Sequence, residues 1–522
     1  MGTETRCGAD AGLTRELLAV CMAGLVLFGP ALWNRDLWSP LETLYGEVAR
    51  EIVSSGDWLT MHQNGAGYYN KPPVHFWLAA AAIKVFGVTA AAVRLPSVLA
   101  GTSCLLLCYL IARRLGIDPL ISSLVLATNW EFFTASQRAT LDVTLTFFIL
   151  LSFYLYIISD GSPRGGLCFL GAAVAAGLAV LTKGPVALLI LACGIFPYLL
   201  VRRQWCEVFH WKWIVMLAVV AAVALGWFIP ACNRQGRLYG ELMNGQVLSR
   251  MGSGWKRSGP FYYYLANFPG MFLPWFVYFP FAVVHLWKRR TERPFEVFLW
   301  FATGFVAFSC FPPKWSRYII PLYPAAAMMV ASYLSTRDSW AGLLSLAAFP
   351  VLAIGAAVAV GIKSGAPLYG FSFGVPVFLI SVAGFHRWRK LGYKVLGGVA
   401  FASLFIFSVT LYPWDNTRRS PKPVARFLQE MDARPSDILW YPAVDPGVAF
   451  YLGYAPMPET DSAQSAAGRP VTWVIARDDT AKAEPEAFAR LKLVKSFPFH
   501  KNEFLVFRND GQGVPGKTGA TE

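Results

Sequence analysis

Long apolar runs recur along the chain from Leu17 to Tyr412, and short polar or basic stretches separate them. A helix needs about 20 mostly apolar residues to cross the hydrocarbon core of a bilayer, so this pattern predicts a polytopic α-helical membrane protein. About thirteen membrane-spanning helices are expected. They cover Leu17–Trp33, Leu95–Ala112, Leu120–Phe133, Val143–Ile158, Leu167–Leu181, Val186–Val201, Ile214–Ile229, Met271–Trp287, Phe295–Phe311, Ile319–Leu334, Ala341–Ile362, Phe371–Phe385 and Val395–Tyr412.

Basic residues orient these helices, because Lys and Arg are enriched in cytoplasmic loops. We expect the first helix to be retained, with its N-terminus in the cytoplasm. The cytoplasmic loops then receive Arg113, Arg114, Arg164, Arg202, Arg203, residues 288–290, Arg337 and residues 386–390. The apolar stretch Pro73–Phe86 is short and contains His75 and Lys84. A crossing there would move the later basic clusters outside, so we interpret it as an interfacial helix on the outer face.

The outer face then holds residues 34–94, residues 230–269 and everything after Pro413. From Asp415 the composition changes, and strand-like runs alternate with a helix-like stretch near Pro485–Leu491, which is typical of a small α/β domain. The predicted domains are a transmembrane domain over residues 1–414 with interfacial helices at about 40–90, a soluble extracytoplasmic α/β domain over 415–509, and a disordered tail over 510–522.

Composition narrows the classes of function. With 55% hydrophobic and 15% charged residues, the chain is no ordinary soluble protein. Its net charge is +15. In a membrane protein, Lys and Arg residues set the orientation of the helices and contact anionic lipid headgroups, so we predict membrane lipids and no nucleic acid as partners. The nine cysteines and six histidines lack metal-ligand spacing, so we expect free thiols, no bound metal and no cofactor. The sequence contains no phosphate-binding glycine motif and no serine-nucleophile motif, so it does not support ATP use or covalent acyl chemistry.

Ionisable groups at the outer ends of the spans are candidates for function, because they are costly near hydrocarbon. Glu42 lies in a first helical turn directly after Pro40, where a carboxylate can point into a cavity. Asp142 begins the fourth span, and a helix-capping role is the alternative. Glu47 and Glu51 are expected on the solvated face of an amphipathic helix.

Several Lys and Arg side chains are predicted on the outer side, against the positive-inside rule. We therefore expect them to bind an anionic partner. Lys183 stands in a tight turn between the fifth and sixth spans, where snorkelling is the alternative. The others are Lys71, Arg250, Lys314 and Arg317. A phosphate carried by a lipid suits them, because Lys and Arg bind it with charge-assisted hydrogen bonds and neutralise charge on a leaving oxygen.

The order of these pieces resembles a known family. The matching stretches are Leu37–Glu51, Gly56–Trp58, Tyr69–Pro73 with Trp77, Phe86–Gly87, Arg94–Pro96, Leu141–Asp142, Leu181–Gly184 and Lys314–Tyr318. The chain is similar to the GT-C glycosyltransferases of the protein mannosyltransferase superfamily, and most closely to the bacterial aminoarabinose transferase branch that modifies lipid A. Three positions depart from the family pattern: Leu41 replaces the catalytic Asp, Asn70 replaces a Glu, and Val247 stands near an expected His.

The resemblance implies a multi-pass enzyme of the bacterial inner membrane with its site on the periplasmic face. Its donor would be a polyprenyl-phosphate-linked sugar, and its acceptor an envelope lipid, such as lipid A, or a glycan. We predict Glu42 as the base and Asp142 as an orienting carboxylate or alternative base. The predicted phosphate cradle consists of Lys71, Lys183, Arg250, Lys314 and Arg317, with hydrogen bonds from Tyr45 and Tyr318.

Other functions stay open at this point. A protein O-mannosyltransferase-like enzyme shares the same pattern. A non-catalytic transporter or binding protein for lipid-linked sugars is suggested by Leu41. An acyltransferase or polysaccharide ligase would need His62 or His75 as a general base.

Overall fold

The computed structural model describes residues 2–160, 163–236, 259–336, 392–453, 456–460, 473–489, 491–499 and 502–509. The chain divides into two compact units. The first unit contains Met1–Leu32, Tyr69–Ala79 and Arg94–Leu411, and the second contains Trp33–Tyr68, Ala80–Val93 and Tyr412–Glu522.

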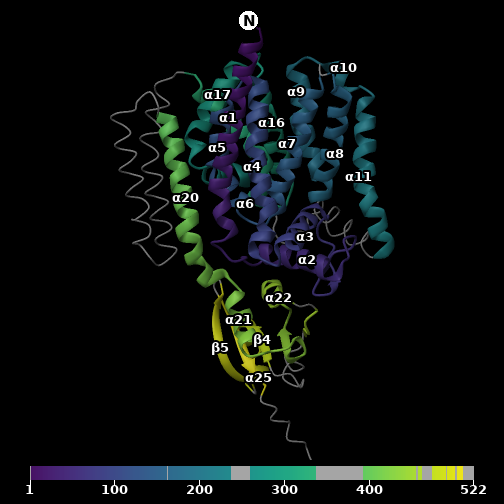
Figure 1. Cartoon of the computed structure of the whole chain (residues 1–522), viewed down its shortest axis with the longest axis vertical. Coiled ribbons are helices and arrows are strands. Elements are labelled where there is room, and N and C mark those ends of the chain that lie inside the picture. Colours follow the sequence, from purple (N-terminus) through teal and green to yellow (C-terminus); the bar gives the residue numbers. More distant parts are fainter. Residues whose placement is uncertain are drawn as a thin grey trace, which may run out of the picture. The chain divides into compact units, whose positions relative to one another are not determined.

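Helices build the first unit (Figure 1). They are α1 (Gly2–Phe28), α4 (Ala90–Leu115), α5 (Pro119–Ala127), α6 (Trp130–Ser136), α7 (Leu141–Ser159), α8 (Gly165–Lys183), α9 (Val186–Val201), α10 (Trp205–Val208), α11 (Lys212–Arg234), α14 (Tyr263–Met271), α15 (Phe279–Lys288), α16 (Phe295–Cys310) and α17 (Tyr323–Leu334). Helix α3 (Val74–Phe86) begins in this unit, and most of α4 and of α20 (Gly392–Arg419) belongs to it. Large apolar side chains such as Leu18, Leu167 and Ile214 stay exposed, as expected of helices that face hydrocarbon.

Five helices of the described part are long and apolar enough to cross a membrane, or six if the pair Tyr263–Met271 and Trp275–Lys288, bent by 116°, counts as one span. The count of about thirteen stays a prediction. Two of its members, Ala341–Ile362 and Phe371–Phe385, lie outside the described residues. The predicted span Leu120–Phe133 is divided into α5 and α6, because the Asn129 side chain accepts a hydrogen bond from the Phe132 backbone N–H and starts a new helix.

Packing between helices positions Lys183 in the first unit. Helix α8 packs against α7 and α11, and α9 packs against α16. A sharp connection joins α8 to α9, since Gly184 has a φ of +85° and Pro185 directly precedes the new helix. Lys183 therefore stands at the end of α8, directly before a two-residue connection to α9, as the tight turn predicts.

The second unit carries a four-stranded mixed sheet with strand order β3-β4-β6-β5. The strands are β3 (Ile438–Tyr441), β4 (Trp473–Arg477), β5 (Lys492–Phe499) and β6 (Asn502–Arg508). Strands β3 and β4 are parallel and the other pairs antiparallel, with Ile475 opposite Val506 in the register. The predicted small C-terminal α/β fold is present.

Helices cover both faces of this sheet. Trp440 and Ile475 share one core with residues of α21 (Lys422–Glu430) and α22 (Pro446–Leu452). Leu439 and Val474 point to the other face and share a core with residues of α24 (Asp478–Ala483) and α25 (Pro485–Phe488). This alternation is the period-two pattern of a strand buried on both faces.

Helix α2 (Leu41–Ser55) also belongs to the second unit, together with the short hairpin β1 (His62–Gln63) and β2 (Ala66–Gly67). The predicted helix is present, but the prediction of a solvated acidic face is wrong. Glu47 is 1% and Glu51 6% exposed. The Arg50 guanidinium binds Glu47, and backbone N–H groups of the hairpin turn donate to Glu51, so both carboxylates have buried partners.

Candidate functional site

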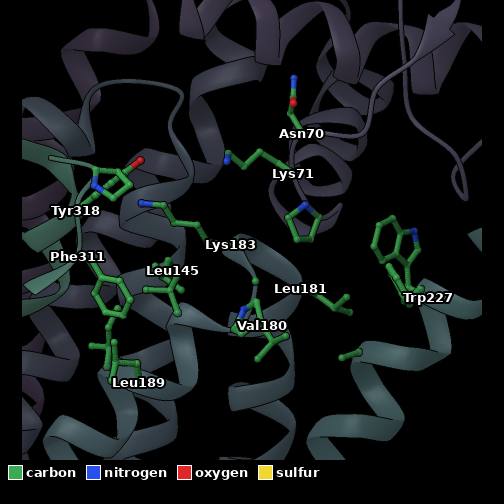
Figure 2. Close-up of a pocket in the computed structure, with 18 of the residues that line it drawn as sticks. Asn70, Lys71, Leu145, Val180, Leu181, Lys183, Leu189, Trp227, Phe311 and Tyr318 are labelled. Atoms are coloured by element: carbon green, nitrogen blue, oxygen red, sulfur yellow. The ribbon is translucent and has the colours of Figure 1, made fainter. Parts of the chain in front are cut away.

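The first unit contains a cavity of about 530 Å³ between the residues before α3, helices α7, α8, α9 and α11, and the end of α16 (Figure 2). Its body is apolar and is lined by Leu145, Val180, Leu181, Val186, Leu189, Ile190, Ala224, Leu225, Trp227, Phe228, Phe308 and Phe311. Asn70, Lys71, Lys183 and Tyr318 add polar groups. Lys71 and Lys183 extend toward the side of the cavity where Tyr318 lies (Figure 2). Such a space suits an amphiphile with an apolar chain and an anionic head.

Lys183 interacts with two groups near this cavity. Its ammonium forms an ion pair with the Asp142 carboxylate, and its Nζ lies 4.7 Å from the centre of the Tyr318 ring. The Lys183 side chain is 11% exposed. A cation so poorly hydrated, at the end of a helix, gains from any negative charge placed near it.

Asp142 lies in the first turn of α7 and is almost fully buried. Besides the Lys183 ammonium, the Arg317 guanidinium approaches it, with Nε 4.0 Å from Oδ2. Arg317 itself stacks on the Trp315 ring at 4.6 Å. The carboxylate therefore stands between two cations and can orient both.

Sequence reasoning missed Glu131 in α6, which belongs to the surroundings of Asp142. The Glu131 carboxylate accepts a hydrogen bond from the Ser316 side chain and interacts electrostatically with Asp142 and Arg317. Glu131 falls inside the predicted span Leu120–Phe133. An ionisable residue within an apolar run was the signal that could have revealed it.

Lys314 has a different environment. Its Nζ donates hydrogen bonds to the backbone carbonyls of Phe308 at 2.9 Å, of Ser309 at 2.6 Å and of Phe311. The side chain thus closes the C-terminal end of α16. Burial lowers the pKa of the ammonium from its ordinary value.

Glu42 and Tyr45 lie on α2 in the second unit, and both are buried. Glu42 Oε1 accepts a hydrogen bond from Arg35 Nη2 at 3.0 Å, and Oε2 accepts one from the Trp38 backbone N–H at 3.1 Å. The structure thus brings together Lys71, Asp142, Lys183, Arg317 and Tyr318 in one unit, and it places Glu42 and Tyr45 in the other. Arg250 and Val247 lie outside the described residues.

In the described part of the chain, no group of three or more His, Cys, Asp or Glu side chains could hold a metal ion. His75 is fully buried, and its Nδ1 lies 3.0 Å from the Thr144 hydroxyl. This places His75 in a packed helix interface.

Known proteins resemble the chain in sequence. Residues 13–233 match the family described as dolichyl-phosphate-mannose-protein mannosyltransferase. An uncharacterized protein of Aquifex aeolicus is 29% identical over 430 residues, which are 81% of this chain and 83% of that protein. An undecaprenyl phosphate-alpha-4-amino-4-deoxy-L-arabinose arabinosyl transferase of Pseudomonas paraeruginosa is 31% identical over 355 residues, which are 66% of this chain and 64% of the transferase. The chain thus spans slightly less than two thirds of that transferase.

The fold is shared with ArnT from Cupriavidus metallidurans, whose crystal structure was determined bound to undecaprenyl phosphate. The TM-score is 0.81 at 21% sequence identity, and the match covers 96% of this chain and 98% of ArnT. At this identity the likeness concerns the fold, and it confirms the predicted helical polytopic architecture. By its sequence matches, the chain is similar to the protein mannosyltransferase family over residues 13–233 and to bacterial undecaprenyl-phosphate aminoarabinose transferases over about two thirds of its length.

Proposed function

We propose that the protein transfers a sugar from a polyprenyl-phosphate carrier to an envelope lipid, such as lipid A, or to a glycan, on the outer face of the bacterial inner membrane. The observation that carries this proposal is the cavity, whose apolar body is joined to the ammonium groups of Lys71 and Lys183. An isoprenoid chain would fill the apolar part, and the phosphate would bind the cations. The matches to undecaprenyl-phosphate arabinosyl transferases support the choice of carrier.

In the proposed reaction an acceptor oxygen attacks the anomeric carbon of the sugar. The bond from that carbon to the carrier phosphate breaks, and the polyprenyl phosphate leaves with the electron pair. Lys71, Lys183, Arg250 and Arg317 would stabilise the charge on the leaving phosphate, with hydrogen bonds from Tyr45 and Tyr318. The proton of an acceptor hydroxyl passes to a carboxylate, for which we propose Glu42. Asp142, held between Lys183 and Arg317, would orient these cations or replace Glu42 as the base.

The test is consumption of the donor. Purified protein in liposomes is given undecaprenyl phosphate carrying a radiolabelled sugar, together with extracted envelope lipids. We expect label to move into an acceptor fraction as free undecaprenyl phosphate accumulates. Leu41, in place of the family's catalytic Asp, favours a second candidate, a binding protein or transporter for the same lipid. That candidate predicts saturable donor binding or movement between leaflets with the sugar still attached.

Topology gives a first prediction. Helix α9 has 16 residues and is therefore about 24 Å long, with Lys183 just before it and Arg202 just after it. Lys183 and Arg202 therefore lie at opposite ends of α9, and Arg202 Nε binds Glu296 Oε1 at 3.3 Å. We expect cysteines replacing Lys71 or Lys183 to react with a membrane-impermeant maleimide from outside, and cysteines replacing Arg203 or Arg289 to react only after permeabilisation. Outside labelling at position 289 would contradict this topology.

A second prediction concerns the phosphate. Lys183→Ala should weaken binding of undecaprenyl phosphate about tenfold or more, because a charge-assisted hydrogen bond contributes about 1.5–3 kcal/mol. Binding is measured by titration in detergent. The matched control is Lys288→Ala, which removes an exposed ammonium in the last turn of α15 and should leave affinity unchanged.

Lys183→Ala also leaves the Asp142 carboxylate without its ammonium partner. The double variant Lys183→Ala/Asp142→Asn removes both charges and separates this repulsion from the lost contact. Unchanged affinity in the single and the double variant would exclude Lys183 from the phosphate site.

A further inference from the structure

The Lys314 side chain binds the backbone carbonyls at the end of α16. The helix ends at Cys310, and Phe311-Pro312-Pro313 follows. The last carbonyls of a helix have no partner inside it, and two consecutive prolines supply no backbone N–H. An ammonium has three N–H donors. The Lys314 ammonium directs them to three carbonyls, those of Phe308, Ser309 and Phe311, while the residue is only 7% exposed.

The same turn is held from its other side. Gly259 donates its backbone N–H to the Pro312 carbonyl at 3.1 Å. A Cβ added to Gly259 would lie 2.6 Å from Lys314 Cγ, so the two backbones approach closely over the lysine stem. The Tyr264 hydroxyl donates to the Trp315 carbonyl at 3.2 Å, and Lys314 Nζ lies 5.4 Å from the Tyr264 ring centre. Lys314 is therefore the centre of a packed junction between α16 and the residues around α14.

The residues that follow this junction interact with the groups of the cavity. Tyr318 donates its backbone N–H to the Trp315 carbonyl at 3.0 Å, and the Arg317 guanidinium stacks on the Trp315 ring. Arg317 approaches Asp142, and the Tyr318 ring faces Lys183. Tyr318 lines the cavity, as does Pro313, while Lys314 is not among the lining residues. The position of Trp315 thus decides where Arg317 and Tyr318 stand.

We infer that Lys314 is a positioning residue, whose ammonium ties the turn after α16 and thereby presents Arg317 and Tyr318 to the cavity, and that it is not a ligand of the carrier phosphate. A phosphate could bind this ammonium only by taking at least one N–H donor away from a backbone carbonyl. The inference rests on the proposed function of the cavity, and it removes one member from the predicted phosphate cradle.

The test combines unfolding without ligand and a double-mutant cycle. Lys314→Met should lower the unfolding temperature of the ligand-free protein in detergent, and it should weaken undecaprenyl phosphate binding about tenfold. In the background Arg317→Met/Tyr318→Phe, the same substitution should change affinity by less than about twofold, because the groups through which Lys314 acts are already gone. Lys314→Arg keeps the donors and should restore part of both losses. If Lys314→Met does not fold, Lys314→Arg alone enters the cycle, with smaller but equally non-additive losses expected.

A direct ligand predicts a different set of results. The ligand-free unfolding temperature would stay unchanged or rise, and the loss of affinity would be the same in both backgrounds. That set would overturn the inference. Wild-type protein that does not bind undecaprenyl phosphate would instead refute the proposed function. The unfolding temperature of the ligand-free Lys314→Met protein would then decide the capping role by itself, since it needs no ligand.

Discussion

Glu42→Gln is expected to lower turnover about 10²–10⁴-fold while binding of the donor stays nearly unchanged, because this is the usual contribution of a positioned general base. Glutamine keeps the size of the side chain and can still accept the hydrogen bond from the Trp38 N–H. Because it also takes the countercharge from the buried Arg35 guanidinium, the unfolding temperature of the variant is measured alongside turnover. What it loses is the negative charge that faces Arg35 and the capacity to take a proton. Turnover and donor affinity are measured with the same labelled carrier sugar.

The matched control is Glu430→Gln, an exposed carboxylate in the same unit, which should leave both quantities unchanged. Asp142→Asn supplies the contrast. Because Asp142 holds Lys183 and Arg317, its loss should change donor affinity as well as turnover. Full activity of Glu42→Gln together with an inactive Asp142→Asn would identify Asp142 as the base. If neither substitution matters and Leu41→Asp creates activity where the natural protein has none, the chain is a binding protein.

The helices could be predicted from the sequence where the hydropathy of one continuous segment determines the structure. Long apolar runs predict α7, α8 and α11 closely, since a continuous apolar surface is compatible only with a buried or lipid-facing helix. The break between α5 and α6 depends on one side chain, Asn129, that satisfies a backbone N–H. Hydropathy averages over such a residue, and therefore the pattern predicts one span where two short helices exist.

The candidate site could be predicted as a set of charges but not as a set of contacts. The sequence places Asp142 and Lys183 at the same end of neighbouring helices, and the structure joins them in an ion pair. It also places Lys314 on the outer side, yet whether an ammonium faces a ligand or three carbonyls depends on how the chain turns after α16. Glu47 illustrates the same limit. Its neighbours in sequence predict a solvated face, and its partner three residues later, Arg50, makes burial possible.

The Glu47–Arg50 pair gives the second large effect. Arg50 donates to both oxygens of Glu47, at 2.8 Å from Nε and 2.7 Å from Nη2, and its Nη1 donates to the Gly453 carbonyl at 3.1 Å. Glu47 is 1% exposed and Arg50 is 4% exposed. Arg50→Met would leave a buried carboxylate without a countercharge, and removing one partner of a buried pair costs about 3–5 kcal/mol. We expect a loss of that order in the free energy of unfolding of the second unit, measured by denaturant titration in detergent.

The pH dependence of this loss follows from the carboxylate. Burial raises the pKa of Glu47 from 4.5 to about 7, against the opposing effect of Arg50, so its ionisation already opposes folding as pH rises through that range. Without Arg50 the folded-state pKa of Glu47 must rise further, while the unfolded-state value stays the same. The deficit of Arg50→Met should therefore be larger at pH 8 than at pH 5, where Glu47 is protonated in the folded state of both proteins. Arg426→Met, which removes an exposed guanidinium of the same unit, is the control. If Arg50→Met costs no more than Arg426→Met, or if its deficit grows on acidification, the buried carboxylate is not the origin of the loss.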